Sequence, residues 1–431
     1  MADQAAGRSF LDQPSLLLFL PLLPLYAAVV ALASDGTLHG DEARYLDYAH
    51  NLLNGSYVSA EQPGLWNGPG YPLLLAPFAF LELPYLVMRL GNAVLLWLAV
   101  AAFHAAIRPF AGRGLALAAG CVFGLYPQFV LALPQIDTEC LVLFLIALLS
   151  FLCLRQPGLA AARWDRRLAI AVVLAGLAMT KVLFGLVIAV LIVFYLGAFL
   201  LARRPAALRW LGIHALAMLF CLPWLGYSYG VTGKLFHWGD AGGMNLYWMS
   251  SPHAGELGDW HGFDRVEQRP ELARNHGEFF AGLKGLSYTE MNDRFTARAL
   301  DNLSEHPAAF ARNWVANIGR LLISYPYSFT PQKLSTLFYL VPNMLLLSLC
   351  LFCLAPALLR RASLPPALWS LLLLVAVAFG GNSLLSAAPR MFNPQLVVLG
   401  AWIAIVFGRV IRMELRPPSR SEAVAAAGPT R

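Results

Sequence analysis

An acidic pair, Asp41 and Glu42, is the first candidate for chemistry, because it follows a long apolar run by only a few residues. A helical pattern starts at Tyr45 and Asn54-Gly55 ends it, so the pair lies at the N-terminal end of a short predicted helix, where the dipole stabilises negative charge. Successive helix positions diverge by about 100°, so only one of the two carboxylates can point at a given atom. Two interpretations stay open: a carboxylate that takes a proton from a hydroxyl, or a plain N-terminal cap with a solvated first turn.

A second acidic pair, Asp137 and Glu139, lies where one apolar run ends and the next begins. Acidic side chains at membrane depth are costly and usually functional. We therefore expect Asp137 to act beside the first pair and Glu139 to line the substrate site. The alternative is that both residues lie at the membrane surface as ordinary solvated acids.

Three basic residues lie near the ends of other apolar runs: Arg89, Lys181 and Arg390. Lys181 follows an apolar run of about 13 residues, shorter than the roughly 20 that a spanning helix needs, so this run can end below the membrane surface. Cations there can hold a phosphate and stabilise it as a leaving group. The alternative for each is a side chain that extends its charge to the membrane interface.

Aromatic residues accompany the first acidic pair. Trp66 and Tyr71 lie in a Gly- and Pro-rich segment, 63–72, which predicts a rigid irregular loop. Their rings suit a membrane interface and a sugar platform equally well. Together with Tyr45 they are expected to line the substrate site.

The elements that position these residues must be membrane helices. Of the 431 residues, 58% are hydrophobic and 13% are charged, whereas a soluble domain carries about a quarter charged residues. The mean hydropathy is +0.61. These values exclude a disordered or collagen-like chain, and the six cysteines lie in apolar runs that indicate no disulfide framework. The net charge of +7 follows from membrane topology, and we expect no nucleic-acid partner.

A helix crosses a bilayer with roughly 20 mostly apolar residues, and the sequence predicts an all-α polytopic membrane protein with ten spans. The run 168–202 is too long for one crossing and has Arg-rich flanks on both sides, so we predict a hairpin that turns near Lys181. The predicted spans are Leu16–Ala33, Leu90–Ile107, Leu115–Leu133, Cys140–Leu154, Leu168–Thr180, Val182–Ala202, Trp210–Tyr229, Leu334–Leu359, Leu368–Leu385 and Met391–Val410.

The distribution of Lys and Arg among the short loops predicts the orientation. With the N-terminus inside, the inner segments hold 17 of the 31 Lys and Arg residues but only 5 of the 24 Asp and Glu residues. We therefore expect both termini in the cytoplasm and the chemistry on the outer side, where two long segments hold seven of the nine histidines. In the second of these, Ser287 and Glu290 have the spacing of a capping box that opens a helix.

Four parts of the chain follow from this pattern. Residues 1–230 form an N-terminal transmembrane module, whose first outer loop, 34–89, is the predicted catalytic loop. Residues 231–333 form a small extracytoplasmic domain. Residues 334–412 form the C-terminal transmembrane helices, and residues 413–431 form a cytoplasmic tail.

The order and spacing of several motifs resemble those of the GT-C glycosyltransferases. The resemblance is best to the branch of protein O-mannosyltransferases and lipid A aminoarabinose transferases, and it covers most of the chain. One departure concerns the first outer loop, where the aminoarabinose transferases carry a Lys before a Pro-Pro pair and this chain has no Lys in 66–70. The motifs are Asp41–Tyr45, Asn67–Pro72, Ile136–Leu141, Gly176–Lys181, Leu222–Trp224, Gly242–Leu246, Glu305–Pro307 and Arg390–Pro394.

The resemblance implies an inverting glycosyltransferase of a bacterial inner membrane. Such an enzyme moves a sugar from a polyprenyl-phosphate donor to an acceptor at the outer face, and the acceptor is a lipid, a glycan or a protein. It implies that Asp41 is the catalytic carboxylate, that Asp137 is the second acidic position, and that Lys181 and Arg390 contact the donor phosphate. From its position near the outer end of the second span, we expect Arg89 to be a further cation at the phosphate.

Two other classes of function accompany this reading. A transporter or flippase of a lipid-linked sugar is the rival class, but such proteins place polar groups near the bilayer midplane, whereas these apolar runs are nearly free of charge. A pure scaffold protein is the other class, and it explains the acidic pairs least well. A divalent metal ion is a possible cofactor: Asp137 with a loop histidine such as His253 or His261 could bind one, although no ligand spacing indicates it.

Overall fold

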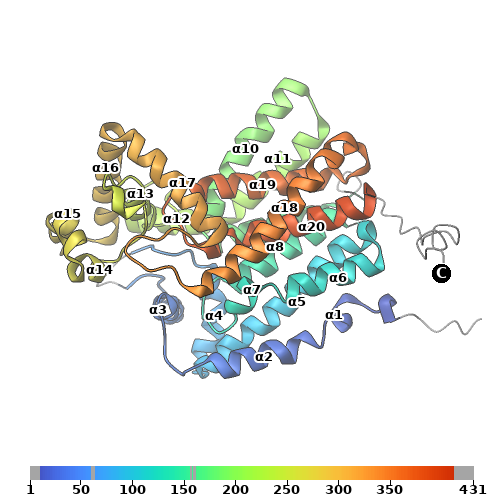
Figure 1. Cartoon of the computed structure of the whole chain (residues 1–431), viewed down its shortest axis with the longest axis horizontal. Coiled ribbons are helices and arrows are strands. Elements are labelled where there is room, and N and C mark those ends of the chain that lie inside the picture. Colours follow the sequence, from blue (N-terminus) through green and yellow to red (C-terminus); the bar gives the residue numbers. More distant parts are fainter. Residues whose placement is uncertain (1–9, 60–63, 156–157, 159–161, 412–431) are drawn as a thin grey trace, which may run out of the picture.

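The computed structural model describes residues 10–59, 64–155, 158 and 162–411. Within these residues it contains helices and no β-strand, so the predicted all-α class is confirmed. Figure 1 shows a body of packed helices with a smaller group of helices at one end. The predicted cytoplasmic tail, 413–431, lies outside the described residues.

The body contains most of the apolar helices. Its elements are η1 (Phe10–Asp12), α1 (Ser15–Leu18), α2 (Leu22–Ala33), α5 (Tyr85–Ala111), α6 (Arg113–Gly124), α7 (Pro127–Leu131), α8 (Glu139–Leu154), α9 (Trp164–Thr180), α10 (Leu183–Ala202), α11 (Pro205–Phe220), α12 (Leu222–Thr232), η4 (Leu334–Thr336), α18 (Leu337–Leu359), η5 (Arg361–Ser363), α19 (Pro366–Ser383), η6 (Pro389–Phe392) and α20 (Asn393–Arg409).

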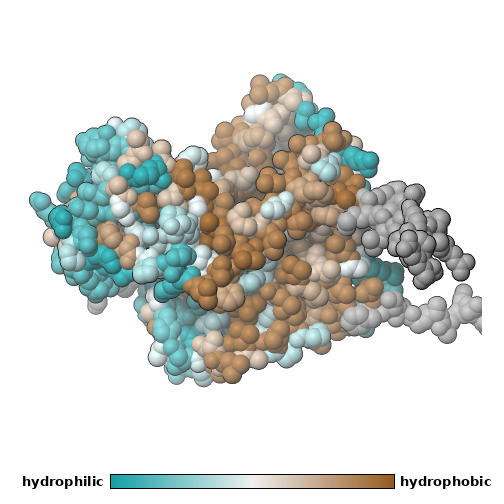
Figure 2. Space-filling model, in the orientation of Figure 1, coloured by the Kyte–Doolittle hydropathy of each residue, from teal (hydrophilic) through white to brown (hydrophobic). Residues whose placement is uncertain are grey.

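Five described helices are long and apolar enough to cross a membrane, and the bent pair α11–α12 makes a sixth. Shorter apolar helices, including α2, α6 and α8, accompany them. Figure 2 shows hydrophobic residues over much of the face of the body that is in view, as expected for a surface in contact with lipid. The polytopic membrane class is therefore confirmed. Seven of the ten predicted spans coincide with one helix each: α5, α8, α9, α10, α18, α19 and α20. The predicted hairpin is also found, because α9 ends at Thr180 and α10 begins at Leu183.

The other three predicted spans are interrupted, which the hydropathy pattern did not anticipate. Leu16–Ala33 is divided between α1 and α2, Leu115–Leu133 between α6 and α7, and Trp210–Tyr229 between α11 and α12, which meet at 47°. A proline lies at or just after each break: Pro21, Pro127 and Pro223. Proline lacks the N–H of a helical hydrogen bond, and its ring clashes with the preceding turn, so it interrupts a helix without making the segment less apolar.

The smaller group of helices, α13–α16, has a hydrophilic surface, at the left of Figure 2, and is called the polar domain here. It consists of α13 (Gly242–Met249), η3 (Ala254–Glu256), α14 (Phe263–Gln268), α15 (Pro270–Ala281) and α16 (Tyr288–Glu305). The capping box at Ser287 and Glu290 is confirmed at the start of α16. The domain has a core of its own, whose buried residues are Met244, Tyr247, Trp248, Val266, Leu272, Phe280, Leu283, Phe295 and Ala299. Helix α17 (Pro307–Ile323) joins it to the body by packing on α18, α19 and η6.

Two further helices belong to the segment 34–89: α3 (Glu42–Leu53) and α4 (Gly70–Phe80). They pack on each other, and α4 also packs on α9. In the body, α5 packs on α8 and α20 packs on both. This arrangement brings the start of α3, the α7–α8 turn, the α9–α10 turn and η6 to one place, where the charged residues singled out in the sequence meet.

Candidate active site

Arg390, in η6, is the centre of an ion-pair network that joins distant parts of the chain. Its Nη2 donates to Oδ2 of Asp41 at 2.9 Å, and its Nη1 donates to Oδ2 of Asp137. Its Nε lies 3.9 Å from Oε1 of Glu139. A guanidinium has five N–H donors in a fixed plane, so it can hold several carboxylates at once. One cation from the C-terminal part of the chain thus gathers both acidic pairs of the sequence.

Asp41 lies directly before α3, but its side chain is not a helix cap. No capping hydrogen bond is made by its carboxylate. Instead, Oδ1 accepts a hydrogen bond from Nη2 of Arg44 at 2.7 Å, and Oδ2 accepts the one from Arg390. The interpretation as a plain cap is therefore wrong for the side chain. The carboxylate is about one-third exposed, and it faces both the charge network and solvent.

Lys181 reaches the second acidic pair from the α9–α10 turn. Its Nζ donates to Oε1 of Glu139 at 2.7 Å. The other oxygen of Glu139 accepts from the Thr138 hydroxyl at 3.0 Å, and the Thr138 N–H donates to Asp137 Oδ1 at 2.6 Å. The side chains of Asp137 and Glu139 are 7% and 5% exposed. The alternative of ordinary solvated surface acids is therefore wrong for this pair.

Glu42 makes different contacts from Asp41, as expected for neighbours on a helix. Its Oε2 accepts from Nη2 of Arg89 at 2.8 Å in a pair that is almost fully buried. The same oxygen accepts from the His39 N–H, and Oε1 accepts from the N–H of Ile136 at 2.7 Å. Arg89 belongs to α5 and Ile136 directly precedes Asp137. The hydrogen bonds of Glu42 therefore connect the start of α3 to α5 and to the second acidic pair. Glu42 thus fixes the distance between the two acidic motifs.

Two residues predicted from the sequence for direct substrate contact lie away from any exposed surface. Arg89 is 1% exposed, and its Nη2 donates hydrogen bonds to Glu42 and to a backbone carbonyl oxygen. It does not join Lys181 and Arg390. Tyr71 is also 1% exposed, and its ring packs edge-on against that of Tyr45 with the centroids 5.2 Å apart. Both are placed to support the site from within the fold.

Arg44 and Asn67 are parts of the site that were not singled out as site residues in the sequence. Nε of Arg44 donates to Oδ1 of Asn67 at 2.8 Å, and Nδ2 of Asn67 donates to the Tyr45 hydroxyl at 3.2 Å. The guanidinium of Arg44 also lies 5.5 Å from the centre of the Trp66 ring. The signal available in the sequence was the three-residue spacing between Asp41 and Arg44, which places the two on one helix face.

A cavity of about 760 Å³ opens beside Asp41, between the segment 34–89 and the polar domain. Asp41 and Arg44 lie on its wall, but neither Lys181 nor Arg390 does. Asp41 therefore separates the cavity from the two cations. The wall is rich in aromatic and polar side chains, which include Asp47, Tyr48, His50, Asn51, Trp66, Trp260, Phe263, Asp264, Tyr288, Asn292 and Phe295.

The carboxyl groups of the network have different affinities for protons. Burial opposes ionisation of Asp41, but the charges of Arg44 and Arg390 outweigh it and hold the pKa of Asp41 below its usual range. Burial and the neighbouring charge of Glu139 raise the pKa of Asp137 to about 7, because together they outweigh the nearby cations. Asp41 is therefore ionised at neutral pH, whereas Asp137 changes its charge there.

The histidines considered as metal ligands lie away from this network. Among the described residues, His253 groups with Glu256 and His276 in the polar domain. His261 is hydrogen-bonded to a serine hydroxyl at 2.9 Å. The suggested combination of Asp137 with His253 or His261 is therefore not found in the part of the chain that the structure describes.

Several solved structures of known proteins are similar to this one in fold. AglB, the archaeal oligosaccharyltransferase from Archaeoglobus fulgidus, was solved with an inhibitory peptide and a dolichol-phosphate. It matches with a TM-score of 0.50 and 14% identity, over 90% of this chain and 50% of that chain. ArnT from Cupriavidus metallidurans, solved with undecaprenyl phosphate, matches with a TM-score of 0.42 and 14% identity, over 91% of this chain and 77% of that chain.

The Pmt1–Pmt2 protein O-mannosyltransferase of S. cerevisiae, bound to its sugar donor, matches with a TM-score of 0.37 and 19% identity. That match covers 56% of this chain and 37% of the yeast chain. No protein-family model matches the sequence, and no curated protein does.

The fold is similar to that of the archaeal oligosaccharyltransferase. The resemblance noted in the sequence is thereby confirmed at the level of the fold. The chain spans half of the length of the archaeal enzyme and 37% of that of the yeast chain. A fold hosts many activities, so the activity has to be argued from the site.

Proposed function

We propose that this chain is an inverting glycosyltransferase that moves a sugar from a polyprenyl-phosphate donor to an acceptor hydroxyl. The observation that carries the proposal is the position of Asp41, whose carboxylate lies on the cavity wall and is bonded to Arg390 on its other side. An acceptor in the cavity and a donor phosphate at the cations would meet at this carboxylate.

Asp41 is the proposed general base. The acceptor oxygen bonds to the anomeric carbon of the sugar, its proton passes to the Asp41 carboxylate, and the bond from that carbon to the phosphate oxygen breaks. Polyprenyl phosphate leaves on the side opposite the attacking oxygen, so the anomeric configuration inverts. A base must be ionised before the reaction, and the lowered pKa of Asp41 meets that condition at neutral pH.

Lys181 and Arg390 are the proposed contacts of the donor phosphate. Both now pair with carboxylates of the second acidic pair, so an incoming phosphate would exchange for one carboxylate partner on each cation. Positive charge held in place beforehand stabilises the negative charge that develops on the leaving phosphate. In this proposal Asp137 and Glu139 set the position of the two cations.

Glu42 and Arg89 are proposed as positioning residues rather than as groups that touch substrate. Their buried pair and the bond from Glu42 to the Ile136 N–H hold the two acidic motifs together. This role replaces the phosphate contact that the sequence predicted for Arg89. Tyr45 and Trp66 are proposed to orient substrate, and the buried Tyr71 is proposed to support Tyr45.

The proposed setting is a bacterial inner membrane with the cavity on its outer face and both termini in the cytoplasm. The lipid phosphates bound to the structurally similar ArnT and AglB support a lipid-linked donor. The acceptor proposed is a hydroxyl of a lipid, a glycan or a protein. Burial of an extended lipid phosphate needs an apolar flank, which the exposed apolar side chains of the body provide.

Mass spectrometry of surface glycolipids and glycoproteins tests the proposal. Cells that lack the protein are compared with the same cells that express the wild type or Asp41→Asn. We expect one glycan to lose a single sugar in the deletion strain, to regain it with the wild type, and to stay truncated with the variant. Identical glycans in all three strains, at equal protein levels, would refute the proposal.

A further inference from the structure

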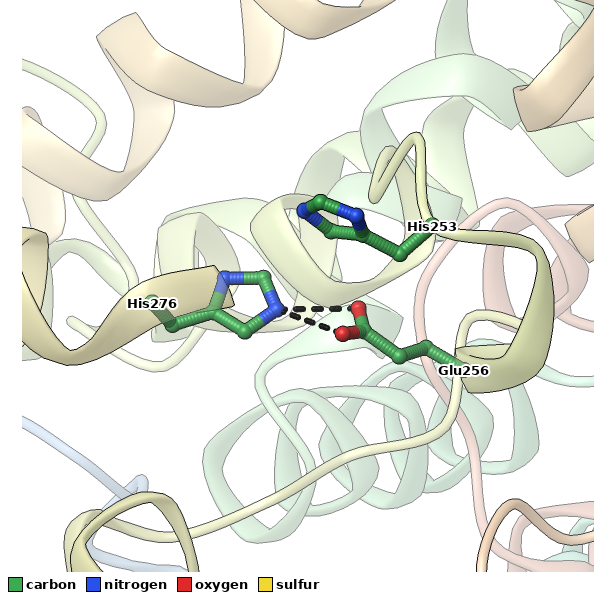
Figure 3. Close-up of side chains that lie close together, drawn as sticks. All are labelled: His253, Glu256 and His276. Carbon is green, nitrogen blue, oxygen red and sulfur yellow. Dashed lines mark hydrogen bonds and ion pairs between the residues drawn. The ribbon is translucent and has the colours of Figure 1, made fainter. Parts of the chain in front are cut away.

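The polar domain contains a second cluster of chemically capable side chains, separate from the charge network. His253 directly precedes η3, Glu256 is the last residue of η3, and His276 belongs to α15. One ligand atom from each of the three lies within 4.8 Å of the other two. Figure 3 shows the His276 ring directed toward the carboxylate of Glu256, with the His253 ring beside both.

Two of the three side chains are held in place by further hydrogen bonds. Nε2 of His276 lies 2.9 Å from both oxygens of Glu256, while its Nδ1 lies 2.6 Å from the Tyr247 hydroxyl. Glu256 also accepts from Asn275 Nδ2 at 2.8 Å and from the Ser251 hydroxyl. Metal-binding histidines usually have their second ring nitrogen fixed in this way. A tyrosine hydroxyl both donates and accepts, so it can hold either tautomer of His276.

His253 is the member of the cluster without such support. Neither of its ring nitrogens makes a hydrogen bond to another described residue, although the ring packs edge-on against that of His276 with the centroids 5.3 Å apart. The ring nitrogens of His253 are therefore available to a metal ion, which binds imidazole through such a nitrogen.

We propose that His253, Glu256 and His276 bind one Zn²⁺ ion. Two imidazoles and one carboxylate are a ligand set that zinc takes, with water in the fourth position. Zinc bonds to nitrogen and oxygen are about 2.0–2.2 Å long, so tetrahedral ligand atoms lie about 3.4 Å apart. Occupancy therefore requires His276 to release its hydrogen bond to Glu256, and it requires ligand atoms separated by up to 4.8 Å to approach one another by up to about 1.4 Å.

The ion would connect two segments of the polar domain. His253 and Glu256 belong to the irregular segment 250–262, which continues into Trp260, Gly262 and the start of α14 on the cavity wall. His276 belongs to α15, in the core of the domain. Zinc would thus anchor the wall of the cavity to a rigid helix. This inference does not depend on sugar transfer.

Direct metal binding tests the site in the full-length, tag-free protein in lipid nanodiscs. After removal of metal with a chelator, Zn²⁺ is titrated in competition with a chromophoric chelator, and bound zinc is counted by mass spectrometry. We expect about one equivalent in the wild type, a loss of affinity of at least about 100-fold in His253→Ala, and a loss of about 10-fold in Tyr247→Phe, which removes only the support of His276. His39→Ala, in the segment 34–89, is the control and should bind like the wild type.

Thermal unfolding supplies a second readout. Because a ligand that binds only the folded state stabilises it, zinc should raise the unfolding midpoint of the wild type and leave that of His253→Ala unchanged. The two proteins should unfold at the same temperature in chelator, since His253 is hydrogen-bonded through its backbone, which the substitution keeps, and its imidazole makes no hydrogen bond within the described residues. The proposal is overturned if the wild type takes up no more zinc than His253→Ala does, or if zinc shifts the midpoints of both proteins equally.

Discussion

Replacement of Asp41 by Asn isolates the proposed proton acceptor. Asn keeps the shape of the side chain and can still accept hydrogen bonds, but it cannot take the proton of the acceptor hydroxyl. General-base catalysis contributes about 10²- to 10⁴-fold to a rate. We therefore expect Asp41→Asn to lower turnover by at least about 100-fold.

The effect of the same change on stability should be small. Asp41 and its partners Arg44 and Arg390 are each about one-third exposed or more, and ion pairs at such positions contribute about 1 kcal/mol or less. Donor affinity should not fall either, because the loss of the Asp41 charge leaves Arg390 with one carboxylate fewer. A large loss of turnover with an unchanged unfolding midpoint would thus be a chemical effect.

The assay is transfer from synthetic undecaprenyl-phosphate sugars by purified protein in nanodiscs, measured as released undecaprenyl phosphate. Asp35→Asn is the matched control, because Asp35 lies in the same segment and pairs only with His39 and Thr37 in the described structure. If Asp41→Asn works within about 10-fold of the wild type, which is less than a general-base contribution, the proton goes elsewhere and Asp137 becomes the residue to test.

Further predictions concern the surrounding charges. Lys181→Ala and Arg390→Ala should each raise the donor KM about 10- to 150-fold, the value of a charge-assisted contact worth about 1.5–3 kcal/mol; a normal donor KM in both would contradict the phosphate role. Glu42→Gln leaves a buried arginine charge without its partner, so it should lower the free energy of unfolding by about 3–5 kcal/mol, and an unchanged denaturant midpoint would argue against the positioning role. Below about pH 7 Asp137 becomes neutral and releases Arg390, so the donor KM should be lower at pH 6 than at pH 8, whereas Asp137→Asn should show the low value at both. Lys284→Cys, an exposed position in the polar domain, should react with a membrane-impermeant thiol reagent added from outside intact spheroplasts, and labelling only after lysis would reverse the predicted topology.

The charged residues of the site could be found in the sequence because their surroundings are so apolar. Asp41, Asp137, Lys181 and Arg390 each lie beside runs with almost no charge, and the structure brings the four into one network. Burial of a charge in a membrane is costly, so a charged residue beside such an apolar run indicates a functional site. Hydropathy also indicated the all-α body and the hairpin at Lys181.

The partners of the charged residues and the burial of individual side chains could not be predicted in the same way. Nothing in the spacing of Glu42 and Arg89 indicates that they bond to each other rather than to substrate, and a Tyr such as Tyr71 suits an interface as well as a buried position. The break between α11 and α12, for example, lies in a segment that is apolar enough for a membrane span. The two parts of the histidine cluster, His253-x-x-Glu256 and His276, are 20 residues apart, and only the fold of the polar domain makes them neighbours.

The order of the network residues along the chain has a consequence for biosynthesis. A ribosome synthesises the acids of the network, from Asp41 to Glu139, long before it reaches Arg390. During that interval the nascent chain holds these carboxylates in or near the lipid without the cation that later gathers them. We expect the half-finished protein to depend on insertion chaperones, and chains truncated before η6 to be degraded by membrane proteases. The charge network is thus complete only in chains that have been synthesised past η6.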